Sequence, residues 1–218
     1  MKNKSIMETN WTQAFQPLFQ QYGKRKHPLD YQNRYQLVVM VILSAQDSDK
    51  HINELAPAIF AAYPNMNSLS RATEADLQRH IGSVRNWGNK AKWLVKLAQT
   101  VGDDENIPRT MDQLTKLPGL GRKSANVIIR ESGDAAEGVI VDLHVLRVAP
   151  RLGIAAEEDA AKPEKVEKKI MAAVSKEFWN DAGMSISFLG REICRPTNPK
   201  CEICPMNTVC KYYKSLKN

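Results

Sequence analysis

The chain has 218 residues, of which 43% are hydrophobic and 25% charged, an ordinary balance for one large globular domain or two small ones. No apolar run approaches the roughly 18 residues that a membrane span needs, so we expect a cytoplasmic protein without a transmembrane helix. The formal net charge of +7 favours a polyanionic partner, with nucleic acid ahead of an anionic membrane surface. A lysine-rich solvated surface is the plain alternative.

Helical periodicity begins near the N-terminus. Apolar side chains recur at spacings of three and four from Trp11 to Tyr22, and Pro17 within this pattern predicts a kink or a late helix start. The run from Tyr35 to Ser44 is apolar on nearly all sides, which predicts a central helix buried by its neighbours. Asp49 is predicted to cap the next helix.

The remaining helices follow from capping residues and apolar spacing. Thr73 offers an N-cap, and Gly82 and Gly88 are predicted to bracket a loop. Further helices are predicted from residue 122 to about 130, after Asp142, over 166–174 and just before the first cysteine. No repeat and no convincing sheet is present, so the predicted fold class is all-α with about ten helices.

The segment LPGLGRK at positions 117–123 is typical of a tight glycine turn between two helices. Gly119 and Gly121 let the backbone turn sharply and come close to another molecule. Amides that open a helix have no helical partner, so they can bind a DNA phosphate without reading bases. A plain corner between two helices is the alternative. Cations are locally unfavourable at a helix N-terminus, so Arg122 and Lys123 there indicate a purpose other than stability.

Within this segment, Lys123 is the stronger candidate for a catalytic role. A lysine near a helix N-terminus and close to other cations is expected to be partly desolvated and partly neutral. A neutral amine can attack carbon and form a Schiff base. The alternative is a lysine that only contacts a phosphate.

Asp142 lies in the segment VDLHV at positions 141–145. Aspartate is a good N-cap, and a capping carboxylate still presents an oxygen to a nearby site. That oxygen can stabilise positive charge developing on a sugar ring, or position a water molecule. His144 is a candidate phosphate contact, with a packing or surface role as the alternative.

The chain has four cysteines, all near the C-terminus, with the spacing C-x6-C-x2-C-x5-C. In a reducing compartment, clustered cysteines are more often metal ligands than disulfides. Four converging thiolates suit a tetrahedral zinc ion or a four-iron cluster, and their spacing leaves both open. The four candidate ligands are Cys194, Cys201, Cys204 and Cys210.

Together these motifs resemble endonuclease III, the iron–sulfur branch of the helix-hairpin-helix DNA glycosylase superfamily. The resemblance rests on LPGLGRKSAN at 117–126, VDLH at 141–144, the cysteine loop, and SAQ at 44–46. It extends from about residue 30 to residue 212. Each motif alone is modestly specific, whereas all of them in this order are highly specific.

The resemblance implies an all-α fold of two lobes with damaged double-stranded DNA bound between them. One domain would be a helical barrel at residues 30–135 that contains the helix-hairpin-helix. The other would combine residues 1–29 and 136–218 and include the cluster loop at 194–210. The resemblance also implies a 4Fe-4S cluster rather than zinc, a monomer, and association with the nucleoid in the cytoplasm.

The implied activity is that of a bifunctional DNA glycosylase and AP lyase of base excision repair, acting on damaged, chiefly oxidised, pyrimidines. The target nucleotide leaves the base stack, Lys123 displaces the base from C1′, and β-elimination breaks the strand 3′ to the lesion. Asp142 would assist departure of the base, and Gln46 would fill the space left in the duplex. The implied contacts to the DNA backbone are Gly119, Gly121, Arg122, His144, Arg195 and Lys200.

The chain departs from the family pattern at three places near the implied base pocket. Leu143 replaces the usual threonine of VDTH, Thr115 stands where glutamate is typical, and the loop SVRNWGN at 83–89 differs from the usual wedge. The resemblance therefore leaves the preferred base open. Val84 and Trp87 are both candidates for the wedge that opens the duplex.

Two other functions fit parts of the sequence. A monofunctional glycosylase of the same superfamily releases the base with water and often lacks the lysine, so Lys123 argues against it. A non-catalytic DNA-binding protein with a structural metal would have no need for both Lys123 and Asp142.

Overall fold

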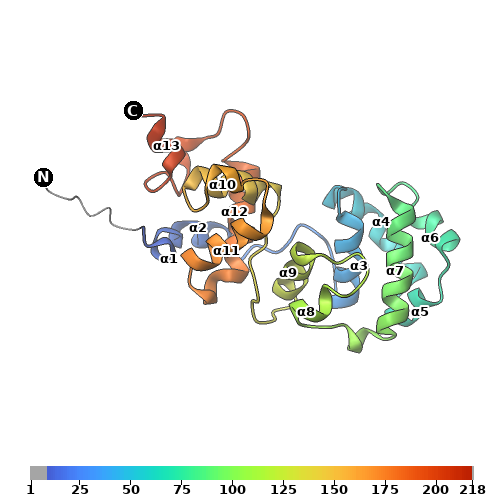
Figure 1. Ribbon diagram of the computed structural model, residues 1–218. Coiled ribbons are helices and arrows are strands. Elements are labelled where there is room, and N and C mark those ends of the chain that lie inside the picture. The colour runs from blue at the N-terminus through green and yellow to red at the C-terminus, as the bar shows by residue number, and fades with distance from the viewer. Residues whose placement is uncertain (1–8, 218) are drawn as a thin grey trace, which may run out of the picture. The chain divides into compact units, whose positions relative to one another are not determined.

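The computed structural model describes residues 9–217, which form helices and loops without a strand (Figure 1). The predicted all-α class is thus confirmed. These residues form thirteen α-helices, more than expected because several have only four or five residues. They are α1 (Trp11–Ala14), α2 (Gln16–Tyr22), α3 (Arg34–Ser44), α4 (Asp49–Ala62), α5 (Met66–Ser70), α6 (Glu74–Ile81), α7 (Trp87–Val101), α8 (Met111–Leu114), α9 (Arg122–Glu131), α10 (Leu143–Leu152), α11 (Pro163–Ala173), α12 (Trp179–Glu192) and α13 (Lys211–Ser215).

The chain divides into two compact units. The first, here called the hairpin unit, is Lys26–Glu137 and holds α3 to α9. The second, here called the cysteine unit, combines the described residues up to Arg25 with those from Gly138 onward. Within residues 9–217, none of the helices has the length and apolar character that crossing a bilayer requires.

Helix α3 is the centre of the hairpin unit. Tyr35 and Leu37–Leu43 are buried, as their apolar run predicted, and α3 packs against α4, α7 and α9 (Figure 1). Asp134, just after α9, pairs with Arg34 at the start of α3 and with Arg109. These ion pairs tie the start of α3 to the segments after α9 and before α8.

Helix α12 has the same central place in the cysteine unit, where it packs against α2 and α10. Its residues Ala182–Gly190 are buried. A Cβ on Gly183 would lie 2.3 Å from the carbonyl oxygen of Ile140, so glycine lets α12 pack directly on the backbone before Asp142. That backbone is held in turn by Glu167 of α11, which accepts a 3.1 Å hydrogen bond from the N–H of Val139.

The helix boundaries confirm some capping predictions and correct others. The N-terminal amphipathic segment breaks at Phe15, and α2 starts with Pro17 in its first turn, as expected. Asp49 is not a cap, because the Ser48 side chain accepts the capping bond of α4 and Asp49 is the first helical residue. Gly88 does not end a loop, because α7 already starts at Trp87.

Candidate functional site

The turn between α8 and α9 uses its two glycines differently. Gly119 has a φ of +80°, which favours glycine, and a Cβ there would lie 3.1 Å from the Cβ of Trp93. Gly121 has a φ of −95°, and nothing lies within 4 Å of the place a Cβ would take. Gly119 is therefore required by the turn and its packing, whereas Gly121 leaves room for a ligand to approach the backbone.

The N-terminus of α9 is suited to an anion. Its N-cap is Gly121, which offers no side chain to the first amides, and its first turn has no acidic residue. Arg122 and Lys123 are exposed on this turn, while Ala125–Ile129 bury the opposite side of the helix. The predicted partial burial of Lys123 is wrong for the protein alone, so any desolvation of this amine must come from a bound ligand.

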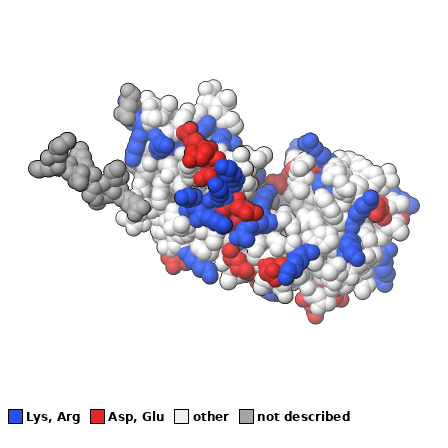
Figure 2. Space-filling model, in the orientation of Figure 1, with Lys and Arg blue, Asp and Glu red and all other residues white. Residues whose placement is uncertain are grey.

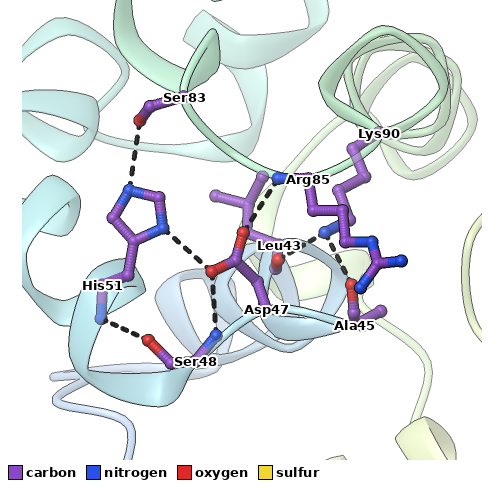
Figure 3. A network of polar contacts seen from close by, with 8 residues as sticks. All are labelled: Leu43, Ala45, Asp47, Ser48, His51, Ser83, Arg85 and Lys90. Atoms are coloured by element: carbon purple, nitrogen blue, oxygen red, sulfur yellow. Dashed lines mark hydrogen bonds and ion pairs between the residues drawn. The ribbon is translucent and has the colours of Figure 1, made fainter.

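Gln46 follows α3 as an exposed residue in the left-handed region, with a φ of +60°. Lys90 of α7 donates hydrogen bonds of 2.7 Å to the carbonyl oxygens of Leu43 and Ala45 (Figure 3). Only 1% of Lys90 is exposed, and this burial lowers its pKa, an effect that the nearby carboxylate of Asp47 opposes. A buried cation thus caps the C-terminus of α3 directly before Gln46.

Asp47 anchors the other side of Gln46. Its carboxylate accepts hydrogen bonds from the backbone N–H groups of Ser48 and Arg85, both at 2.8 Å, and lies 2.9 Å from Nδ1 of His51 (Figure 3). Burial alone would raise the pKa of Asp47, but these hydrogen bonds outweigh it and lower the pKa. The carboxylate therefore ties the Gln46 loop to the 83–89 loop.

The 83–89 loop presents different residues from those the sequence suggested. Val84 is only 2% exposed, so it is a core residue and the prediction that it is a wedge candidate is wrong. Trp87 is half-buried as the first residue of α7. The exposed tip consists of Arg85 and Asn86, and Asn86 is left-handed with a φ of +59°.

Asp142 is bound through both carboxylate oxygens. One accepts 2.9 Å hydrogen bonds from the N–H groups of His144 and Val145, which is the predicted N-cap of α10. The other accepts a 2.6 Å hydrogen bond from the hydroxyl of Ser187 on α12 and lies 3.9 Å from the guanidinium of Arg191. Each carboxylate oxygen has two acceptor sites, so the second oxygen can accept one more hydrogen bond.

Leu143 and Thr115, two of the departures from the family pattern, lie in different units. Leu143, the residue that follows Asp142, is 79% exposed and presents an apolar side chain at the start of α10. Thr115, in the hairpin unit, donates its hydroxyl at 2.8 Å to the carbonyl of Met111 within its own turn. The threonine is thus occupied locally, and neither position offers the polar group that the family pattern has there.

Two arginines of α10 hold the start of the cysteine loop. Arg147 lies 3.2 Å from Nδ1 of His144 and donates to the carbonyl oxygen of Cys194 at 3.3 Å. Arg151 donates to the carbonyl oxygen of Arg195 at 2.8 Å and lies 3.5 Å from the sulfur of Cys194. These bonds connect the Asp142 helix to the cysteine loop, on which Arg195 and Lys200 are exposed.

The four cysteines line one cavity whose wall includes Leu152, Leu189 and Ile193, and none of them forms a disulfide. Burial raises the pKa of Cys204 to about 11, and the neighbouring cysteine charges add to this effect. Four sulfur donors around one cavity fit a tetrahedral metal ion or a four-iron cluster, and thiolates crowded in an apolar cavity need the positive charge of such a group.

Sequence reasoning missed the side chains that support these candidates. Lys90 and Ser187 are buried polar residues on otherwise apolar helix faces, and no motif marks them. A polar residue on an otherwise apolar helix face, with no partner nearby in the sequence, is the one signal that could have pointed to them.

Cations and anions are mixed on the face of the molecule that Figure 2 shows. Figure 2 shows Lys and Arg on the visible face of both units, interleaved with Asp and Glu. The exposed cations of the predicted site are Arg122 and Lys123 in the hairpin unit, and Arg195 and Lys200 in the cysteine unit.

Comparison with known proteins gives matches over most of the chain. The family model described as "HhH-GPD superfamily base excision DNA repair protein" matches residues 39–176. Endonuclease III of Bacillus subtilis is 36% identical over 185 residues, which cover 84% of this chain and 83% of that protein. Endonuclease III of Synechocystis is 34% identical over 184 residues, again 84% of this chain and 83% of that protein.

Solved structures agree with these matches. A trapped covalent intermediate of endonuclease III with DNA has a TM-score of 0.84 and 30% identity, and covers 97% of this chain and 100% of that chain. A thermostable thymine-DNA glycosylase, 20% identical with a TM-score of 0.76 over 94% of this chain and 95% of that one, shares the fold. A family model thus matches more than half of this chain, and relatives more than 30% identical align with it over most of their own length. This chain therefore belongs to the HhH-GPD superfamily of base excision DNA repair proteins and, within it, to the endonuclease III family.

Proposed function

We propose that this base excision repair enzyme, a DNA glycosylase and AP lyase, removes damaged pyrimidines, chiefly oxidised ones, from duplex DNA. The observation that supports this best is the exposed amine of Lys123 on the first turn of α9, beside the open backbone of Gly121. A similar endonuclease III, 30% identical, was trapped in a covalent complex with DNA. An accessible amine at an anion-binding helix terminus is what a Schiff base with a DNA sugar requires.

In the proposed reaction, the amine of Lys123 attacks C1′ of an extruded nucleotide. The bond from C1′ to the base breaks, and the base leaves with a proton. Opening of the sugar gives the Schiff base, which acidifies the hydrogen on C2′. Loss of that proton breaks the bond from C3′ to its phosphate oxygen, so the strand is cut 3′ to the lesion.

Asp142 would stabilise the positive charge that develops on the sugar as the base departs. Its two capping bonds and the bond from Ser187 fix the carboxylate, which then has no need to reorganise during the reaction. The acceptor site remaining on its second oxygen is available to a substrate or a water molecule.

The other predicted residues would hold the DNA. Gly119, Gly121 and Arg122 would bind a phosphate at the start of α9, and Gln46 would fill the space that the flipped nucleotide leaves. His144, Arg195 and Lys200 would contact phosphates from the cysteine unit. We keep the division into a 30–135 domain and a second domain, and the monomeric state, as parts of this proposal.

The four cysteines would hold a 4Fe-4S cluster, which binds to members of this family. The four sulfurs line one cavity, and membership of the endonuclease III family favours a cluster over a single zinc ion there. When bound, the cluster supplies the positive charge that keeps four thiolates together and thereby orders the loop with Arg195 and Lys200. We expect brown protein with broad absorption near about 400 nm and about four irons per chain, measured by absorption and elemental analysis. Colourless protein with stoichiometric zinc would overturn the cluster assignment.

The proposed function is tested by trapping with sodium borohydride on a panel of duplexes. The panel holds thymine glycol, dihydrouracil, uracil, 8-oxoguanine opposite adenine, and an abasic site. We expect a covalent adduct on the oxidised pyrimidines and on the abasic site, seen on a denaturing gel. Base release without any adduct would favour the monofunctional glycosylase, and binding without either reaction would favour the non-catalytic protein.

A further inference from the structure

We propose that Lys90 is a positioning residue that holds Gln46 in the conformation in which it enters the duplex. The inference rests on the proposed function, since it assigns a role to a side chain that supports the DNA-contacting loop. Lys90 is buried in α7 and does not reach the surface, so it acts only through the backbone of residues 43–45.

The end of α3 is built in an unusual way. Helices commonly end with glycine in the left-handed region, because glycine has no Cβ to clash there. Here Gln46 is the left-handed residue, and the carbonyl oxygens of Leu43 and Ala45 are bound by a buried ammonium at 2.7 Å. A glycine at 46 and an apolar side chain at 90 would end the helix without a strained residue or a buried charge. The arrangement present therefore favours display of a long polar side chain over stability.

Gln46 is fixed from both sides. Ala45 before it is held by Lys90, and Asp47 after it is held by the N–H groups of Ser48 and Arg85 (Figure 3). The side chain of Gln46 is exposed and has no hydrogen bond to any residue that the structure describes. A residue whose backbone is anchored and whose side chain is unoccupied is prepared for a ligand.

The same anchors connect Gln46 to the tip of the next loop. Asp47 accepts the N–H of Arg85, and Nε2 of His51 lies 3.1 Å from the hydroxyl of Ser83 (Figure 3). Hydrogen bonds therefore link the exposed tip at Arg85 to the Gln46 loop. In the proposed reaction, the side chains of Gln46 and Arg85 would both contact the opened duplex. Lys90 would fix the position of the Gln46 loop relative to α3.

The test replaces Lys90 with methionine, which keeps the length and apolar stem of the side chain but removes the ammonium. We expect Lys90→Met to slow single-turnover base release from a thymine glycol duplex by about 10- to 100-fold, since a small misplacement of a positioning group costs this much. Strand cleavage of a single-stranded abasic oligonucleotide needs no duplex opening and should stay at the wild-type rate. Lys96→Met, on an exposed lysine of the same helix, is the matched control and should leave both rates unchanged.

A double-mutant cycle separates positioning from a general loss of structure. If Lys90 acts through Gln46, Lys90→Met should cause little further loss in a Gln46→Ala background. An equal loss in both backgrounds, an equal loss on the single-stranded substrate, or wild-type base release by Lys90→Met would each overturn the inference. If Lys90→Met does not fold, Asp47→Asn takes its place. We expect Asp47→Asn to slow base release from the duplex, to leave cleavage of the single-stranded abasic oligonucleotide unchanged, and to cause little further loss in the Gln46→Ala background. The same three outcomes would overturn the inference. Wild-type protein inactive on every duplex would instead contradict the proposed function.

Discussion

Lys123→Gln is expected to abolish borohydride trapping and strand cleavage, reducing the cleavage rate by about 10⁴-fold or more, because a glutamine amide cannot form a Schiff base. Lys123 is exposed on the first turn of α9, and glutamine is nearly as good a helix former as lysine. The free energy of unfolding should therefore change by no more than about 0.5 kcal/mol. Trapping gels on an abasic duplex measure the reaction, and equilibrium binding to the same duplex should persist.

A matched control is available within the same segment. Lys116 is an exposed lysine paired at 2.6 Å with Asp112, and Lys116→Gln removes the same charge without touching α9. This variant should retain trapping. If Lys123→Gln instead forms the adduct as wild-type protein does, the nucleophile is another amine.

Asp142→Asn should slow base release by about 10²- to 10³-fold, the usual cost of removing one electrostatic stabiliser from a transition state. The fold should survive, because asparagine caps helices as well as aspartate and keeps an oxygen for the N–H groups of His144 and Val145. Its amide then faces Ser187, whose hydroxyl can accept rather than donate. We expect a loss of about 1 kcal/mol in the free energy of unfolding.

Single-turnover base release and thermal unfolding measure the two effects separately. Ser187→Ala is the informative companion, since it keeps the charge of Asp142 but removes one of the bonds that hold the carboxylate. We expect it to slow base release less than Asp142→Asn does. If Asp142→Asn releases the base at the wild-type rate, Asp142 acts only as a helix cap.

Much of the local structure could be predicted because its causes lie close together in the sequence. The apolar run at 35–44 must be enclosed, so α3 was recognisable as a central helix. The N-cap role of Asp142 depends on amides two and three residues away. The glycine turn before Lys123 and the grouping of the cysteines were likewise evident from spacing alone.

The support of the site depends on residues far apart in the chain, so only the tertiary structure decided it. Ser187 reaches Asp142 across 45 positions, and Lys90 reaches Ala45 across another 45. The exposure of Lys123 and the burial of Val84 also depend on what packs around them, which helical periodicity does not specify. The sequence by itself determined the family, the all-α class and the chemical groups of the site, because these follow from residue type and local spacing. The tertiary structure decided which buried side chains hold those groups in place, because hydrogen-bond partners and burial arise only when distant helices pack together.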